Sequence, residues 1–167
     1  VLPGIVDVHG DAFERAVMPR PGVAFPYETA LADVDGQLLA NGITTEFHGV
    51  TYSWEGGLRG RTYALRMLDT LDAMRPHLGA QHLMHLRFEL HHADGLADAL
   101  AWMDAGRVHF LSFNDHLPVM RDKLGDARKL GQYADRAECD VDTFRARFHA
   151  AAANAGKVDT VTATLAR

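Results

Sequence analysis

The stretch Gly4-Ile5-Val6-Asp7-Val8-His9-Gly10-Asp11 decides both the fold and the chemistry of this chain. Its apolar, β-branched residues predict a short buried strand over residues 4–9, followed by two side chains that can bind a metal. Alternate residues of a strand share a face, so His9 and Asp11 point the same way. A divalent cation held between them is one interpretation. A strand end with an ordinary histidine and a solvated aspartate is the other.

Strands and helices alternate beyond this stretch. β-branched and aromatic residues predict three further strands, over residues 43–50, 82–90 and 108–113. Apolar residues at helical spacing predict helices between them: one from Glu28 to the Asn41-Gly42 stop, one closed by Pro76, and one capped by Asp94 and ended by Gly106. Beyond Pro118 the pattern is wholly helical, with starts at Asp140 or Asp142 and at Asp159, and a break at Gly156.

This alternation is typical of parallel βαβ units, which leaves two architectures. A doubly wound sheet usually carries a glycine-rich phosphate turn after its first strand, and here that turn reads His-Gly-Asp. A complete (β/α)8 barrel needs about 250 residues and eight strands, and this chain supplies roughly half of those strands. We therefore predict an α/β chain whose residues 1–167 form a single domain, the N-terminal part of a TIM-like barrel with about four strands.

Composition limits the partners. The chain has 167 residues, 47% of them hydrophobic, and a net charge of −5 with scattered basic residues, which argues against a nucleic-acid binder. Its one cysteine, Cys139, can form no disulfide within the chain, which suits a reducing compartment and predicts a cytoplasmic protein. No apolar run approaches the roughly 20 residues of a membrane span, and no basic leader opens the chain.

The first residues predict that the chain begins inside a longer protein. There is no initiator methionine, and a strand starts almost at once. A half barrel alone would expose sheet edges and core surface. We therefore expect either the remaining barrel half or assembly into a homo-oligomer to cover them.

The third predicted strand carries charges on one face. Arg87 and Glu89 share the parity of His85, whereas the alternate positions are apolar. If the apolar set faces the helices, these charges face the barrel axis, where burial costs several kcal/mol unless they pair or meet a metal. An Arg87–Glu89 ion pair is the alternative to a metal site.

The ends of the other strands are also polar. Asp115 and His116 follow the fourth strand, at the rim where such barrels build active sites. His48 is a further rim candidate, with half-buried packing as its alternative. The other histidines that lie near element boundaries are expected to pack rather than to bind: His77, His82, His109 and His149.

Several blocks together resemble the amidohydrolase superfamily, and within it the diphosphatases of the carbon–phosphorus lyase pathway. The first-strand block Pro3-Gly4-Ile5-Val6-Asp7-Val8-His9-x-Asp11 is the general signature. The narrower resemblance rests on these blocks: Glu14-Arg15-x-x-Met18-Pro19-Arg20-Pro21-Gly22-Val23, Gly42-Ile43-Thr44-Thr45, His85-Leu86-Arg87-x-Glu89-Leu90-x-His92 and Ser112-x-x-Asp115-His116-x-Pro118. It runs through about residue 121 and more loosely to the end.

The resemblance implies a site and a reaction. His9, Asp11 and Glu89 would be ligands of a divalent metal, most simply Zn²⁺. His116 would be a further metal ligand or catalytic group. Asp115 would orient His116, whereas Arg20, Arg87 and His92 would bind the substrate. The implied reaction is attack of a metal-activated water on the 5-triphosphate of a ribose 1-methylphosphonate, giving the 5-phosphate and pyrophosphate.

Alternatives stay open because the chain departs from that pattern. Ala12 stands where an asparagine is common, and Val119-Met120 replace a usual Gly-Gln. The family's later ligands and general base fall beyond residue 167. Amide or cyclic-amide hydrolysis, as in deacetylases or deaminases of the superfamily, is one alternative. A metal-binding half barrel without turnover is the other.

Overall fold

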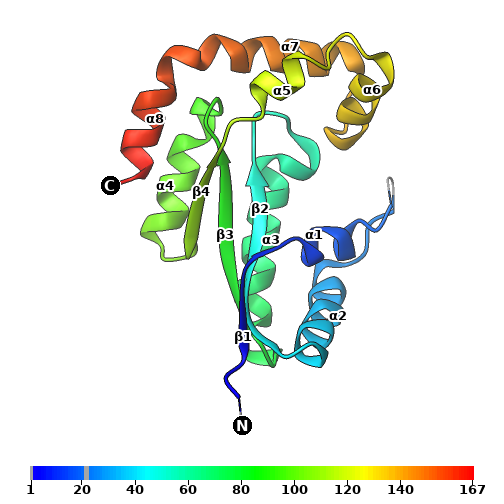
Figure 1. Cartoon of the computed structure of the whole chain (residues 1–167), viewed down its shortest axis with the longest axis vertical. Helices are drawn as coiled ribbons and strands as arrows, with labels where there is room; N and C mark the ends of the chain where they lie inside the picture. The colour runs from blue at the N-terminus through cyan, green and yellow to red at the C-terminus, as the bar shows by residue number, and fades with distance from the viewer. Residues whose placement is uncertain (1, 21–22) are drawn as a thin grey trace.

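The four strands form one parallel sheet in the order β1–β2–β3–β4 (Figure 1). The structure is a computed structural model that describes residues 2–20 and 23–167. Its strands are β1 (Ile5–Gly10), β2 (Ile43–Tyr52), β3 (Gln81–Glu89) and β4 (Phe110–Asn114). Consecutive strands that pair in parallel, each next to the last, are the first half of a barrel. The structure is thus consistent with a fragment of a TIM-like barrel.

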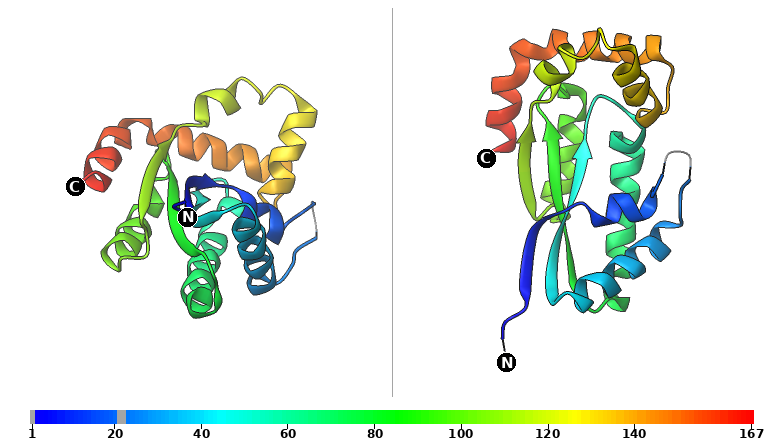
Figure 2. Two further views of the ribbon diagram at one scale, coloured as in Figure 1. Left: turned by 60° about the horizontal axis from the view of Figure 1, so that its bottom comes forward. Right: turned by 45° about the vertical axis from the view of Figure 1, so that its right-hand side comes forward.

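Three crossover helices cover one face of the sheet, which we call the helix face (Figure 2). They are α2 (Tyr27–Ala40), α3 (Arg61–Met74) and α4 (Leu96–Asp104). Short helices also stand in the loops: α1 (Ala12–Val17), and the 3-10 turns η1 (Gly57–Arg59), η2 (Arg75–His77) and η3 (Ala93–Gly95). The opposite face, which we call the open face, carries no helix across its middle (Figure 2).

The main core lies between the sheet and these helices. Leu86 and Phe88 of β3 are fully buried there, against Leu31 of α2 and Met67 and Leu68 of α3. Apolar burial of this kind contributes about 25 cal/mol per Å² and fixes which side of each strand faces the helices. The alternation in β3 therefore sets the orientation of its polar residues toward the open face, as the sequence predicted.

A second layer of helices lies across the carboxyl ends of the strands (Figure 1). It comprises α5 (Leu117–Arg121), α6 (Ala127–Arg136), α7 (Val141–Ala153), the 3-10 turn η4 (Asn154–Lys157) and α8 (Val158–Leu165). A small separate core holds α5, α6 and α7 together through Leu117, Leu130 and Phe144. Asp140 caps α7 by accepting from the Thr143 amide at 2.7 Å, so the first of the two predicted starts is confirmed.

Some local predictions were wrong. Asp94 lies in η3 and makes no cap hydrogen bond, and α4 begins behind Gly95 instead. Lys157, rather than Asp159, precedes α8. The second strand runs to Tyr52, two residues beyond its predicted end. Within the described ranges, no helix is both long and apolar enough to cross a bilayer.

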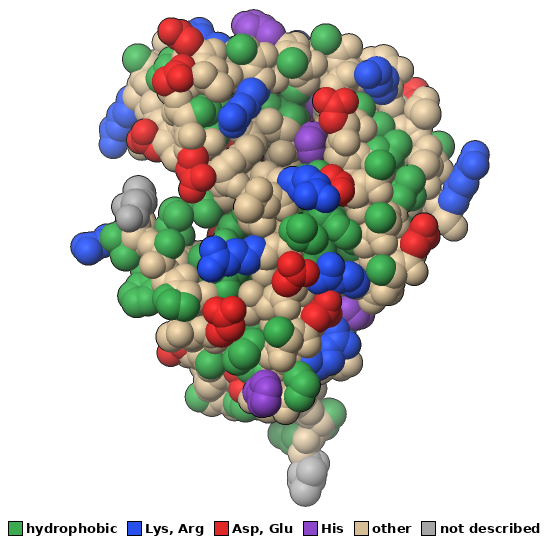
Figure 3. Space-filling view, turned by 180° about the vertical axis from the view of Figure 1, so that it is seen from behind, with side chains coloured by type: hydrophobic (Ala, Val, Ile, Leu, Met, Phe, Trp, Pro, Cys, Tyr) green, Lys and Arg blue, Asp and Glu red, His purple; other side chains and the backbone are tan. Residues whose placement is uncertain are grey.

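The two outer strands leave apolar residues uncovered. Ile5, Val6 and Val8 of β1 are each more than half exposed, and Phe110 of β4 is nearly so. Figure 3 shows that the helix side, by contrast, carries basic and acidic side chains interspersed over its surface. The prediction that the first strand is buried was therefore wrong for the described chain, whereas the expectation that a half barrel exposes its sheet edges agrees with these residues.

Candidate functional site

Paired positions of the parallel strands place a polar row on the open face. Gly49 of β2 pairs with His85 of β3, and Thr51 pairs with Arg87. Arg87 in turn pairs with Ser112 of β4, and Glu89 with Asn114. Because paired residues of parallel strands share a face, these side chains all lie on the side that the crossover helices leave free.

Gly49 lets side chains from β1 and β3 meet across β2. A Cβ at Gly49 would lie 3.3 Å from Asp11 Oδ1 and 3.4 Å from Arg87 Cδ, so both already press against this position. Side chains of β1 and β3 also meet directly, because the Nδ1 atoms of His9 and His85 are 3.3 Å apart. The Nε2 atom of His85 is 2.8 Å from Ser112 Oγ. The result is a continuous polar contact from β4 through β3 to β1.

Asp11 lies beside this chain of contacts. Its Oδ1 atom is 3.9 Å from His9 Nε2 and 4.0 Å from Arg87 Nη1. The side chains of His9 and Asp11 are about half exposed, at 47% and 53%. An imidazole nitrogen and a carboxylate oxygen thus stand side by side and open to solvent, as the first-strand motif predicts.

A second polar pair lies farther along the sheet. Both oxygens of the fully buried Glu89 accept from His116, one from its backbone amide and one from Nδ1, each at 2.9 Å. Asp115 was predicted to orient His116, but it faces His91 instead, with 3.4 Å between Oδ1 and Nε2. Glu89 takes that orienting role because it ends β3 directly beside the β4 terminus. No Arg87–Glu89 ion pair forms among the described side chains.

The two pairs lie on different rungs of the sheet. β1 pairs only with the first part of β2, and an irregularity between Asp7 and Gly10 brings Gly10 level with His48. Glu89 follows His85 by four residues, about 13 Å along the strand. Across residues 2–20 and 23–167, no three His, Cys, Asp or Glu side chains are grouped closely enough to hold a metal ion. Imidazole nitrogens and carboxylate oxygens suit a divalent cation, but they form two separate pairs, His9 with Asp11 and Glu89 with His116. The roles of these residues as metal ligands stay predictions.

Two predicted substrate contacts lie away from these pairs. Arg20 is exposed and forms an isolated antiparallel bridge with Val23. The neighbouring Pro21 and Gly22 of the signature block lie outside the described residues. His92 packs edge-on against Tyr52, with ring centres 4.7 Å apart, and burial lowers its pKa to about 4. Its place against an aromatic ring of the core explains why it resists protonation.

His48, predicted at the rim, lies in mid-strand on the helix face. The prediction failed because β2 continues to Tyr52 and because even-numbered positions of β2 face the helices. Its Nε2 is 2.8 Å from His82 Nδ1, and His82 Nε2 is 2.9 Å from Asp35 Oδ1 of α2. All of His48 is buried, and burial followed by the nearby His82 lowers its pKa to about 3. This chain of contacts is part of the core.

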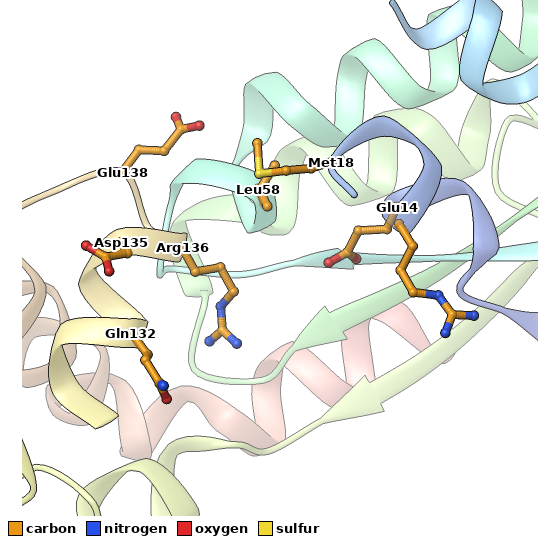
Figure 4. A pocket seen from close by; sticks show the side chains of 8 residues that line it. Glu14, Met18, Leu58, Gln132, Asp135, Arg136 and Glu138 are labelled. Atoms are coloured by element: carbon orange, nitrogen blue, oxygen red, sulfur yellow. The ribbon is translucent and has the colours of Figure 1, made fainter. Parts of the chain in front are cut away.

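A cavity of about 520 Å³ lies between α1 and the end of α6, next to η1 (Figure 4). The side chains of Glu14 and Arg136 extend into it, with Met18 and Leu58 as apolar wall. Figure 3 shows the molecule hollowed between the α1 region and the C-terminal helices. Burial raises the pKa of Glu14, with Arg59 opposing and Asp11 adding to the rise. The cavity is therefore within electrostatic reach of Asp11 and has the size of a small-molecule pocket.

Sequence reasoning missed the group that anchors Arg136. Glu55, 1% exposed, forms ion pairs with Arg136 and with Arg59, the latter at 3.0 Å. Arg147 of α7 donates to the Glu55 carbonyl at 2.6 Å. Burial opposes ionisation of Glu55, but the two guanidinium charges prevail and lower its pKa. The residues that meet at Glu55 are up to 92 positions apart in the sequence, so no local motif could have predicted these contacts.

The chain is 30% identical over 137 residues to the α-D-ribose 1-methylphosphonate 5-triphosphate diphosphatase of Escherichia coli (strain K12). The match covers 80% of this chain and spans 36% of that protein. No protein-family model matches the chain. No solved structure gives a significant match. The chain is thus a distant relative of a diphosphatase, and shares with it about a third of that protein's length.

Proposed function

We propose that the chain is part of a metal-dependent hydrolase that acts on a phosphorylated or phosphonate-bearing small molecule. The observation that carries the proposal is the meeting of Asp11 and Arg87 over Gly49, with His9 beside Asp11. It unites metal-capable donors with a guanidinium on one accessible surface. The similarity to a protein named as a triphosphate diphosphatase supports the same class. The finer proposal is that the substrate is ribose 1-methylphosphonate 5-triphosphate and that pyrophosphate is released.

The residues divide into roles. His9 and Asp11 would hold the divalent cation, most simply Zn²⁺, with Glu89 and His116 as the second donor pair. When bound, such a cation supplies a water whose pKa is lowered to about 7. Arg87 would bind phosphoryl oxygens through its planar guanidinium, and Arg20 would do so from the loop. Glu89 occupies the Nδ1 side of His116, so Nε2 is the nitrogen of that ring that would either bind the cation or exchange a proton with the substrate.

The cavity beside α1 suits the body of such a substrate. Glu14, which lies in the first turn of α1 after Asp11, and Arg136 of α6 offer a hydrogen-bond acceptor and a donor beside the apolar Met18 and Leu58. A site of this size that adjoins charged groups at strand ends is the usual arrangement for small polar ligands. The proposal therefore places the reacting phosphorus near Asp11 and the rest of the molecule toward α6.

A binding module without turnover is the second candidate. The absence of a three-residue metal group from the part of the chain that the structure describes favours it. A pair of donors can retain a cation weakly without completing a catalytic centre. The two candidates differ in turnover and agree in metal binding, so one assay separates them.

The test measures pyrophosphate release by the complete gene product with added Zn²⁺, alongside bound metal. We expect turnover of the ribose triphosphate and a loss of at least about 100-fold in His9→Ala. His77→Ala, an exposed histidine of η2 on a turn before β3, is the matched control and should retain full activity. Metal retention without turnover would favour the binding module. Hydrolysis of cyclic amides but not of the triphosphate would reject the phosphorus chemistry.

A further inference from the structure

We propose that the cavity beside α1 binds the vicinal hydroxyl groups of a sugar and that Glu14 determines this specificity. This inference rests on the proposed function, because it names the part of the phosphorylated substrate that the cavity receives. Glu14 and Met18 belong to the same sequence block as Arg20, but the proposed function assigns no particular ligand group to either. Both line the cavity of about 520 Å³ (Figure 4).

The half-buried Glu14 carboxylate is not satisfied by the protein itself. It makes no hydrogen bond with another described residue. The guanidinium groups of Arg59 and Arg136 are within electrostatic reach, but both pair with the buried Glu55 instead. Burial, followed by the charge of Glu14, raises the pKa of Tyr63, yet the buried Tyr63 hydroxyl donates to no described group. The Glu14 carboxylate therefore has its acceptor capacity available to a ligand in the cavity.

The α6 side of the cavity offers donors. Arg136 is held by Glu55, and 28% of its side chain is exposed. Gln132, one helical turn earlier in α6, adds an amide that both donates and accepts. A hydroxyl group can donate to Glu14 and accept from Arg136 at once, whereas a phosphate dianion only accepts and an ammonium group only donates. The polar groups of the cavity therefore suit hydroxyls better than either ion.

The charges around the cavity also disfavour a phosphoryl group. Among the described residues, the charged side chains that line it are three carboxylates and two guanidiniums: Glu14, Asp135, Glu138, Arg15 and Arg136. The charge of Arg136 is already balanced by Glu55. A phosphoryl group here would thus meet an excess of negative charge, whereas on the open face it meets Arg87. A neutral hydroxylated group avoids that repulsion.

The shape of one carboxylate specifies neighbouring hydroxyls. An ionised carboxylate has two acceptor oxygens and no donor, so Glu14 can accept from hydroxyl groups on two adjacent carbons. Met18 and Leu58 supply apolar surface for the C–H groups of a sugar. A sugar that lacks one of the hydroxyls would leave a half-buried charged oxygen unpaired. Glu14 should therefore distinguish ribose from deoxyribose.

The test observes the cavity directly and needs neither metal nor turnover. The complete gene product is labelled with ¹³C-methyl methionine, and the Met18 signal is assigned with Met18→Leu. At pH 8 with a chelator, D-ribose 5-phosphate should shift the Met18 signal. 2-Deoxy-D-ribose 5-phosphate should bind at least about 10-fold more weakly. Inorganic phosphate should leave the Met18 signal in place.

Variants assign the discrimination to Glu14. Glu14→Gln, which keeps the shape but loses the charge, should lower the affinity for ribose 5-phosphate to about that for the deoxy compound. Glu28→Gln, at an exposed glutamate in the first turn of α2, is the matched control and should change neither affinity. Should Glu14→Gln fail to fold, Gln132→Trp at an exposed position of α6 narrows the cavity and should abolish the Met18 shift.

The inference can fail in several ways that are separate from the proposed function. An unmoved Met18 signal with ribose 5-phosphate would overturn it, and so would equal affinities for the two sugar phosphates. A Met18 shift with inorganic phosphate, or full discrimination in folded Glu14→Gln, would also count against it decisively. The proposed function fails through missing pyrophosphate release and metal binding, which these measurements do not involve.

Discussion

Two histidine pairs lie on opposite faces of the same sheet, in very different surroundings. On the helix face, the rings of His48 and His82 stack at 13° with 2.8 Å between nitrogens. On the open face, the rings of His9 and His85 meet edge-on at 68° with 3.3 Å between nitrogens. The first pair is sealed under helices, whereas His9 is half exposed. The same side-chain pairing is therefore structural on one face and available for chemistry on the other.

The sealed pair ends in a fixed carboxylate. Asp35 accepts from the backbone amides of Gly79 and Ala80 and from His82. Burial opposes ionisation of Asp35, but these hydrogen bonds outweigh it and lower its pKa. This carboxylate joins α2 to the start of β3. The open pair ends in Asp11, whose Oδ1 atom lies 3.9 Å from His9 Nε2 and 4.0 Å from Arg87 Nη1.

The largest effect is expected from removing the Asp35 carboxylate, which holds the buried His48–His82 pair. Asp35→Ala should destabilise the protein by about 3 kcal/mol, because it leaves His82 and two backbone amides without their acceptor. Urea unfolding measures the change. Asp33→Ala, at an exposed aspartate on the same helix that accepts a hydrogen bond from Gln37, should stay within about 0.5 kcal/mol. Equal losses in the two variants would mean that the sealed chain carries no special stability.

Two glycines of the open sheet sharpen the comparison at the next level. A Cβ at Gly10 would overlap the buried Glu46 carboxylate, so Gly10→Ala should cost about 2 kcal/mol. A Cβ at Gly49 would lie 3.3 Å from Asp11 Oδ1 and 3.4 Å from Arg87 Cδ, which small side-chain shifts can relieve, so Gly49→Ala should cost less than about 1 kcal/mol. Gly49→Ala should nevertheless lower turnover and Zn²⁺ affinity, because it separates the groups that meet there. Thermal unfolding and metal titration check both. A stability loss at Gly49 as large as that at Gly10 would contradict the distinction between the faces.

The last effect depends on pH and concerns Glu46, a carboxylic acid buried on the helix face. Burial, with Asp7 and Asp11 nearby, raises its pKa to about 7. The folded state then binds the proton more tightly than the unfolded state, so stability should fall as pH rises from about 4.5 to 7. Glu46→Gln should be more stable than the natural protein by up to about 3 kcal/mol at pH 8, and the gain should shrink toward pH 5. Denaturant midpoints at both pH values test this; a gain that does not vary with pH would show that Glu46 is not the titrating group.

The sequence predicted the strands and their parity well where the pattern is local. Leu86 and Phe88 alternate with Arg87 and Glu89, and the structure places the two sets on opposite faces. The prediction for His48 was wrong for a local reason as well, since residues 49–52 extend β2 beyond it. Alternation identifies a face only when the strand's end is known.

The rung at which each strand ends could not be predicted. It depends on the irregular pairing between Asp7 and Gly10, which sets β1 against the first part of β2. No residue type in this stretch predicts the shift in register. The shift determines whether Asp11 and Glu89 lie at the same height along the strands. The anchoring of Arg136 by Glu55 was equally hidden, because tertiary packing alone brings them together.

The buried Glu55 has a consequence for how the molecule opens. The Glu55 carboxylate links Arg59 of η1 and Arg136 of α6 to the loop after β2. The backbone carbonyl of Glu55 links α7 to the same loop by accepting a hydrogen bond from Arg147. Helix α8 packs into the main core, whereas α5, α6 and α7 otherwise pack around a small core of their own. Their local unfolding therefore requires breaking a desolvated charge cluster that dissolved salt screens poorly. The helical layer over the strand ends is thereby bound into the same cooperative unit as the sheet, and a fluctuation that frees the layer must also release the wall of the cavity that Arg136 lines.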